Sequence, residues 1–228
     1  MIHYEWGFAD LLPYWPELLD GALLTLKLSA WATVLGFALG TACAVARHSG
    51  PRWLQSLVGA YVEVIRNTPL LVQVFLVYFG IASLGIRVNA NMAAVLALVV
   101  NVGAYTCEIV RAGIESVQRA QVEAGECLGL SPLQVYRHII LAPAFERVYP
   151  ALTGQYVMLM LASSITSQIS AEELTAVTNR VQSDTFRAFE AYFVVWVVYL
   201  ALSFVVRLAF WAFGQFAFPR RRRLGTPL

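Results

Sequence analysis

The chain alternates long apolar stretches with short polar ones, and this pattern predicts membrane-spanning helices. Five windows carry no Lys, Arg, Asp or Glu: residues 28–46, 67–86, 88–107, 148–171 and 191–206. Because about 20 apolar residues cross the hydrocarbon core of a bilayer, each window holds most or all of one spanning helix. We therefore expect an all-α integral membrane protein with five transmembrane helices, at about residues 22–46, 66–86, 91–113, 149–170 and 191–213.

The composition supports a membrane protein of one domain. Of the 228 residues, 59% are hydrophobic and 13% are charged, whereas about a quarter of the residues in soluble domains carry charge. No internal repeat or low-complexity linker divides the chain, so we expect a single transmembrane domain over residues 1–228. The first residues include Glu5, Asp10, Glu17 and Asp20, where a cleaved signal peptide would be basic, so the first span should remain in the mature protein.

The basic residues predict the orientation in the membrane. Five spans place the termini on opposite sides, and one side receives twelve of the sixteen basic residues, including four arginines at 220–223. Since Lys and Arg concentrate in cytoplasmic loops, the N-terminus should lie outside and the C-terminus in the cytoplasm. A nucleic-acid-binding tail is the other interpretation of the four arginines, but their place after an apolar span favours the topological one.

Two features inside the spans predict how helices pack and bend. Gly36 and Gly40 form a GxxxG pattern, which lets another helix approach closely. Pro69 should bend or start the second span, because proline lacks the amide hydrogen that a helix interior needs.

The longest loop, at about residues 115–142, predicts a helix, a turn and a second helix. The first helix covers residues 115–128 and ends at Gly129, while Ser131 caps a second helix that begins at Pro132 and stops before Pro143. The second helix presents an apolar face made of Leu133, Tyr136 and Ile140.

Two other interpretations fit the same helical pattern. An interfacial helix lying on the lipid headgroups has the same periodicity. A DNA-binding helix-turn-helix has the same outline, but Arg137 and His138 are too few cations for phosphate contacts.

The residues of this loop resemble a known family. Glu123-Ala124-Gly125, then Gly129, then Ile140-Leu141, resemble the EAA loop of the permease subunits of ATP-binding-cassette (ABC) importers. The flanking segments TLKLS at 25–29, EVIRNTPLLVQVFLVYFG at 63–80 and AYTCEIVRAGIESV at 104–117 resemble the permeases of the polar amino acid uptake family. The resemblance covers nearly the whole chain in order, and it implies the type I importer permease fold in the bacterial inner (cytoplasmic) membrane.

The resemblance also implies functional residues and partners. In that family the EAA loop is a coupling helix that binds a groove of a cytoplasmic ATPase, which implies ATPase-coupling roles for Glu123, Ala124, Gly125, Gly129, Ile140 and Leu141. Gly125 stands where alanine is usual, and Ala142 stands where proline usually follows the leucine. The implied partners are two ATPase copies, a second permease that is identical or homologous, a periplasmic solute-binding protein, an amino acid substrate and the lipid bilayer.

The chain lacks the motifs of an enzyme. A Walker loop requires Gly-Lys-Ser/Thr, and the single lysine, Lys27, follows a leucine. Ser163 and Ser164 have no nearby histidine and no Gly-x-Ser-x-Gly elbow surrounds them. Neither the three cysteines nor the three histidines have metal-ligand spacing. We expect a non-catalytic subunit without a cofactor or metal of its own, whose partner ATPase binds ATP and Mg²⁺.

Polar side chains inside the spans are candidates for a substrate pathway, because such groups are costly in hydrocarbon. The candidates are Gln73, Asn101, Tyr105, Glu108, Ser163, Ser164 and Thr166. Hydroxyl groups can instead bond to the carbonyls of their own helix, so a structural role stays open for the serines and Thr166. Arg111 is placed to neutralise Glu108 and Arg66 to neutralise Glu63; for Glu108 the alternatives are a structural ion pair and recognition of a substrate ammonium.

The segment at residues 172–190 is predicted to lie outside the membrane. It mixes four acids with Arg180 and Arg187, which predicts a solvated helix or loop and, by resemblance, contacts with the binding protein.

The resemblance also implies the overall function. It predicts a permease subunit that moves a polar amino acid, driven by ATP hydrolysis in a separate subunit. The alternative is a gradient-driven secondary carrier or a small channel, although the chain shows no inverted repeat. An assembly factor without transport would leave the polar cluster unexplained.

Overall fold

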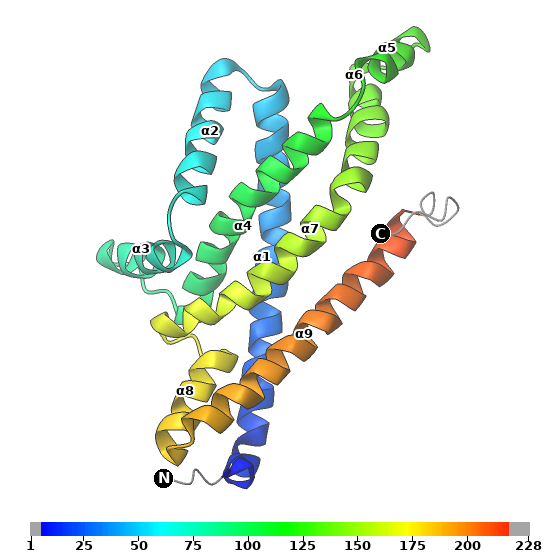
Figure 1. Ribbon diagram of the computed structural model, residues 1–228. Helices are drawn as coiled ribbons and strands as arrows, with labels where there is room; N and C mark the ends of the chain where they lie inside the picture. The colour runs from blue at the N-terminus through cyan, green and yellow to red at the C-terminus, as the bar shows by residue number, and fades with distance from the viewer. Residues whose placement is uncertain (1–5, 219–228) are drawn as a thin grey trace. The chain divides into compact units, whose positions relative to one another are not determined.

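Helices make up nearly all of the described chain. The computed structural model describes residues 6–218, so the arginines at 220–223 lie outside the described residues (Figure 1). The helices are η1 (Phe8–Tyr14), α1 (Trp15–Ser49), α2 (Arg52–Arg66), α3 (Leu70–Ser83), α4 (Ala90–Glu115), α5 (Arg119–Cys127), α6 (Pro132–Gln134), η2 (Val135–Leu141), α7 (Ala142–Ala162), η3 (Ser163–Ile169), α8 (Leu174–Thr185) and α9 (Ala188–Ala217). The all-α integral membrane architecture is therefore confirmed.

Three helical stretches are long and apolar enough to cross a bilayer: Phe8–Ser49, Ala90–Glu115 and Ala188–Ala217. A fourth candidate is the pair α2 and α3, whose axes differ by 111° at the break between them. The number of apolar spans found among residues 6–218 is thus three or four, and the predicted count of five stays a prediction. Over the most apolar part of α9 only 6% of the residues are buried by the rest of the chain, as lipid contact requires.

The second and fourth predicted spans differ in detail from the helices. A bend follows α2 at Asn67 and Thr68, and α3 starts directly after Pro69 with 14 residues. At about 1.5 Å per residue, α3 reaches about 21 Å, which is short of a bilayer core of about 30 Å. In the fourth predicted span, α7 ends at Ala162 and the chain continues as the 3₁₀ helix η3.

The chain divides into two compact units, each with its own packing. Unit 1 contains the chain up to Thr33, Leu70–Leu98 and Val157–Arg207. One of its apolar clusters joins α1, α8 and α9 around Leu18, Leu174 and Val195. A second cluster joins α1, α3, α4 and η3, with Val74, Ala97 and Ile169 buried at its centre.

Unit 2 contains Val34–Pro69, Val99–Tyr156 and the chain from Leu208, and the GxxxG pattern lies in its core. A Cβ atom on Gly36 would be 2.2 Å from Val102 Cγ1, and one on Gly40 would be 2.6 Å from the Gly103 carbonyl oxygen. The two glycines therefore let α1 contact the backbone of α4, as their spacing predicts.

The second helix of the predicted hairpin does not stop before Pro143. The π-helical segment η2 runs directly into α7, and Pro143 is the second residue of α7. Proline is tolerated there because its missing amide hydrogen falls at a change of hydrogen-bond register, where a π-helical turn meets an α-helix. The hairpin is thus continuous with α7.

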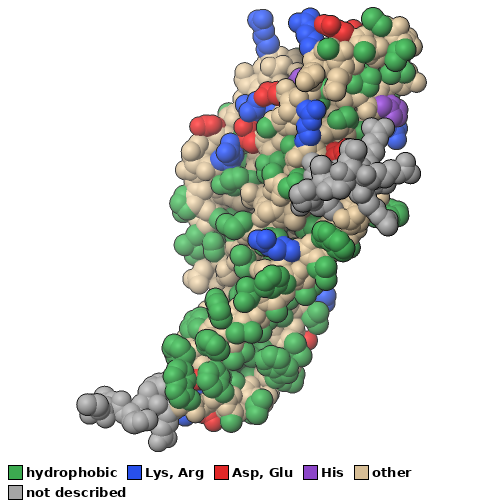
Figure 2. Space-filling model, turned by 45° about the vertical axis from the view of Figure 1, so that its right-hand side comes forward, with side chains coloured by type: hydrophobic (Ala, Val, Ile, Leu, Met, Phe, Trp, Pro, Cys, Tyr) green, Lys and Arg blue, Asp and Glu red, His purple; other side chains and the backbone are tan. Residues whose placement is uncertain are grey.

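Many hydrophobic side chains lie on the face of the molecule that Figure 2 shows. The exposed tryptophans and phenylalanines on α9 include Trp196, Phe204 and Trp211. Many large exposed apolar side chains on one protein mark contact with lipid or with another chain.

Candidate functional site

The predicted coupling hairpin forms one end of unit 2, between α4 and α7 (Figure 1). Its first helix, α5, ends in a Schellman motif: Gly129 N–H donates to Glu126 O at 2.9 Å and Leu130 N–H donates to Gly125 O at 3.2 Å. Gly129 has φ +76°, the left-handed conformation that glycine adopts without strain. Gly129 therefore ends the helix in the role that the sequence predicts.

The second half of the hairpin starts with the predicted cap. Ser131 forms a capping box with Gln134, in which each side chain bonds to the backbone N–H of the other residue, and Pro132 occupies the first helical turn. On either side of this turn, Leu128 is 81% exposed and Leu133 is 77% exposed. The tip of the hairpin thus presents two leucine side chains that nothing else in the described chain covers.

The glycine at residue 125, where the EAA motif usually has alanine, has a structural reason. Gly125 is the buried residue of α5, and a Cβ atom there would be 2.3 Å from Ile139 Cδ1 and 3.5 Å from Val135 Cγ2. Val135 is the buried residue of η2, whereas Leu133 of the predicted apolar face points to solvent. The two halves of the hairpin therefore pack through Gly125, Val135 and Ile139.

The other motif residues divide between the surface and the packed side of the hairpin. Glu123 and Ala124 are exposed, and the Glu123 carboxylate lies 3.1 Å from the Arg119 guanidinium one helical turn earlier. Ile140 and Leu141 are partly buried in η2. The motif thus offers an exposed charged face on α5 and an apolar link into α7.

Two contacts join the hairpin and its flanking turn to the rest of unit 2. Arg147 of α7 donates to the side-chain oxygen of Ser116 at 2.9 Å, which joins α7 to the turn between α4 and α5. The rings of His48 and Tyr136 lie 6.2 Å apart, which places η2 beside the end of α1. The hairpin is therefore joined to α1 through η2, and α7 is joined to the turn that precedes α5.

Three predicted pathway residues share one face of α4. Asn101, Tyr105 and Glu108 are spaced four and three residues apart and are each partly exposed, while the residues between them, including Val102, Thr106 and Cys107, are buried. Ala112 and Glu115 continue the same face and are exposed. The part of α4 in unit 2 therefore has one accessible stripe, and most of its side chains are polar.

Glu108 forms ion pairs with three arginines. Its carboxylate contacts Arg47 of α1, Arg66 of α2 at 3.5 Å and Arg111 at 3.0 Å, and its side chain is 21% exposed. Arg111 also reaches Glu115 at 2.5 Å. The predicted Glu108–Arg111 pair is present, but Arg66 pairs with Glu108 rather than with Glu63.

Arg66 also links the ion pairs to the aromatic residue of the stripe. Its guanidinium carbon lies 5.5 Å from the centre of the Tyr105 ring, within the range of a cation–π contact. The Glu63 carboxylate instead accepts a hydrogen bond from Asn67 at 2.9 Å. One carboxylate thus joins α1, α2 and α4.

The remaining predicted pathway residues lie in unit 1. Gln73 is buried on α3, which packs against η3, the helix that carries Ser163, Ser164 and Thr166. Ser163, Ser164 and Thr166 donate to Met160 O, Leu161 O and Ser163 O at 2.7–2.8 Å. These bonds satisfy the hydroxyl groups on their own helix, which is the structural alternative that the sequence left open.

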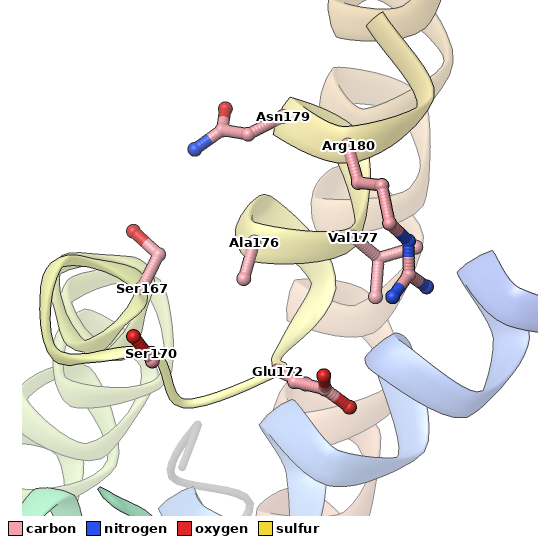
Figure 3. Close-up of a pocket in the computed structure, with 7 residues that line it drawn as sticks. All are labelled: Ser167, Ser170, Glu172, Ala176, Val177, Asn179 and Arg180. Atoms are coloured by element: carbon pink, nitrogen blue, oxygen red, sulfur yellow. The ribbon is translucent and has the colours of Figure 1, made fainter. Parts of the chain in front are cut away.

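A shallow polar pocket of about 310 Å³ lies where η3 meets α8 (Figure 3). Ser167 and Ser170 line one side, and Asn179 and Arg180 come from α8. Arg180 is already paired with Glu17 of α1 at 2.5 Å, and Asn179 Oδ1 accepts a hydrogen bond from Tyr192 at 2.6 Å. The arginine of this pocket is therefore already ion-paired.

The expectation that residues 172–190 are a solvated run is wrong for two of its four acids. Glu173 and Glu190 are both completely buried. Glu173 caps α8 and Glu190 accepts from Gly7 N–H at 3.0 Å. The burial of these two acids was not predicted from the sequence, and neither was the ion pair of Arg47 with Glu108. For Glu173 the one available signal was its position three residues before Ala176, at a helix start, which is typical of a capping residue.

Comparison with known proteins identifies the family. Residues 32–216 match the family model described as "Binding-protein-dependent transport system inner membrane component". A probable glutamine ABC transporter permease protein of Bacillus subtilis is 38% identical over 185 residues, which cover 81% of this chain and 86% of that protein. The nopaline transport system permease protein of Agrobacterium fabrum is 34% identical over 206 residues, covering 86% of both chains.

A solved structure agrees with the sequence relatives. The crystal structure of an amino acid ABC transporter with histidines superposes with a TM-score of 0.84 at 32% identity, over 93% of this chain and 99% of that one. The MetNI methionine ABC transporter, at 20% identity and a TM-score of 0.77, shares the fold. This chain belongs to the family of binding-protein-dependent transport system inner membrane components, and it is a membrane-spanning permease subunit of an ABC importer rather than an enzyme.

Proposed function

We propose that this permease carries a polar amino acid across the inner membrane, with its N-terminus outside and its C-terminus in the cytoplasm. Two ATPase copies bind ATP and Mg²⁺, a second permease completes the membrane part, and a periplasmic solute-binding protein delivers the substrate. Relatives of this chain are named for glutamine, nopaline and octopine, which supports an amino acid or a derivative of one as substrate.

The observation that carries the proposal is the hairpin of α5, α6 and η2. Its exposed face bears Glu123 and Ala124, and its tip bears Leu128 and Leu133, which are a suitable surface for a groove on an ATPase. Because the hairpin is joined to α1, α4 and α7, a displacement of α5 on ATP binding would shift these helices and change access to the pathway.

The stripe of Asn101, Tyr105 and Glu108 supports a pathway along α4. A polar face that the rest of the chain leaves partly exposed is unfavourable against lipid, so it should face a second permease and the substrate. Three guanidinium groups already contact Glu108, which supports a structural role for its carboxylate over direct binding of a substrate ammonium.

The test is purification from the native membrane in a mild detergent, followed by reconstitution. We expect an ATPase and a binding-protein-stimulated ATPase activity in the purified complex, and uptake of one or more polar amino acids into proteoliposomes. In the same assay Glu123→Lys should keep the permease in the membrane but remove the ATPase stimulation. Normal ATPase binding and uptake by this variant would contradict the coupling role of the hairpin.

The alternative carrier or channel makes the opposite prediction. Liposomes that contain this chain alone would then transport solute without ATP. Robust flux under those conditions would overturn the importer proposal.

A further inference from the structure

Glu173 places a carboxylate at the junction of three segments of unit 1. Its side chain is completely buried between α1, α8 and α9. Taking a carboxylate out of water is costly unless several donors compensate it. No Lys or Arg is within ion-pair distance of Glu173 in the described chain, so hydrogen bonds must supply the compensation.

Three donors and one longer hydroxyl contact meet at this carboxylate. Tyr199 O–H donates to Oε2 at 2.7 Å, and the Thr25 hydroxyl, which donates to Gly21 O at 3.0 Å, lies 3.5 Å from the same atom. Ala176 N–H donates to Oε1 at 2.9 Å, and Thr175 N–H adds a further backbone bond. Burial raises the pKa of Glu173, and each of these bonds acts against that rise by favouring the carboxylate.

The donors bond to one another as well. Thr25 is itself completely buried and accepts from Leu174 N–H at 3.2 Å, while Tyr199 and Thr175 share a hydroxyl contact of 2.9 Å. Together, Thr25, Glu173, Thr175 and Tyr199 form what we term the outer latch. It joins the N-terminal part of α1, the first turn of α8 and the middle of α9.

Glu173 of the outer latch lies four residues after Ile169, the last residue of η3. The chain between them is held tightly: Ser170 has φ +63°, an unfavourable value for a residue with a side chain, and Ala171 is buried with its N–H bonded to Thr166 O. A strained turn persists only when its surroundings determine it. The latch therefore adjoins the C-terminal end of η3, the helix in which Ser163 and Thr166 are buried.

We propose that Glu173 is a positioning residue for transport, which holds η3 and α8 onto α1 and α9 so that the outer end of the permease moves as one body. This inference rests on the proposed function for its transport readout. Loss of the latch lets η3 and α8 move separately, so that binding-protein docking is less efficiently converted into opening of the pathway. The expected change is in the turnover number, while the KM for the loaded binding protein stays near wild type.

The test compares Glu173→Gln with Asp20→Asn in the complete transporter with its ATPase and binding protein. Gln has the shape of Glu but directs an NH₂ group at donors that need an acceptor. Glu173→Gln should lower the turnover number about tenfold at normal membrane abundance, as one satisfied buried network is broken. Asp20→Asn, which alters an exposed carboxylate on α1, should stay near wild type, and Glu173→Asp should recover part of the rate.

A distance measurement separates this inference from the proposed function. Spin labels at Ser183→Cys on α8 and Asp20→Cys on α1, in a chain with its native cysteines replaced, should give one narrow distance distribution. Glu173→Gln or the milder Tyr199→Phe should broaden it. A narrow distribution and wild-type turnover in Glu173→Gln would overturn the latch, whereas absence of any amino acid uptake by the wild-type complex, with the broadening present, would overturn only the proposed function.

Discussion

Gly125 of α5 lies so close to Ile139 of η2 that a Cβ atom at residue 125 would be 2.3 Å from Ile139 Cδ1. Non-bonded carbon atoms do not approach to this distance, so an alanine would force the Ile139 side chain to move. The glycine of this EAA-like motif is therefore matched to a large residue on the opposite half of the hairpin.

Gly125→Ala should loosen the hairpin by about 1 kcal/mol, because overpacking outweighs the better helix propensity of alanine, which is itself worth about 1 kcal/mol. Gly125→Ala combined with Ile139→Val should recover the loss, since valine lacks the Cδ1 atom. Hydrogen exchange of the α5 amides measures the effect, with Ile139→Val alone as the control. Equal or slower exchange in the single Gly125→Ala variant would show that Ile139 moves aside at no cost.

Gly129→Ala should weaken the end of α5 by about 1 kcal/mol, because alanine resists the left-handed conformation that the Schellman motif requires. Gly154 of α7 is the matched control: a Cβ atom there meets no other atom within 4 Å. We expect faster hydrogen exchange at Gly129 and Leu130 and several-fold weaker binding of the ATPase. Gly154→Ala should leave both unchanged, and identical ATPase affinity in the two variants would contradict the prediction.

Glu108→Gln should lower the stability of unit 2, because three arginines lose the one carboxylate they share. Since these side chains are partly exposed and screened, we expect a loss of about 1–2 kcal/mol rather than the larger cost of a fully buried ion pair. The measurement is thermal unfolding in detergent together with uptake of cationic, neutral and anionic amino acids. Glu115→Gln, which removes a single contact to Arg111, is the control.

The uptake profile decides between the two interpretations of Glu108. A structural ion pair predicts equal loss for all substrates. A selective loss of cationic substrates with unchanged stability would instead assign Glu108 to ammonium recognition.

Tyr136→Phe should not destabilise the hairpin. The Tyr136 hydroxyl is buried without a hydrogen-bond partner among residues 6–218, so its removal deletes an unsatisfied polar group. Tyr61 is the comparison, because its hydroxyl donates to Val100 O at 2.7 Å and Tyr61→Phe should cost about 1 kcal/mol. Thermal unfolding of both variants in one detergent tests the contrast, and a similar loss in both would show that Tyr136 is paired in solution.

The sequence by itself determined the features that depend on near neighbours in the chain. Apolar windows predicted the membrane helices because the thickness of a bilayer requires about 20 apolar residues, whatever those helices pack against. Gly129, Ser131 and Pro132 predicted the hairpin turn because helix ends are closed by residues within one turn. The motif residues predicted the family, and the match of residues 32–216 to the family model confirmed it.

Only the tertiary structure decided which distant groups meet. Glu108 and Arg111 are one helical turn apart and could be paired from the sequence, but Arg47 and Arg66 reach the same carboxylate from two other helices. The sequence predicts Glu173 to be one of several solvated acids, but it is buried beside Thr25 and accepts a hydrogen bond from Tyr199, both far away in the sequence. The burial of a charge depends on donors brought by chain folding, and no local pattern records them.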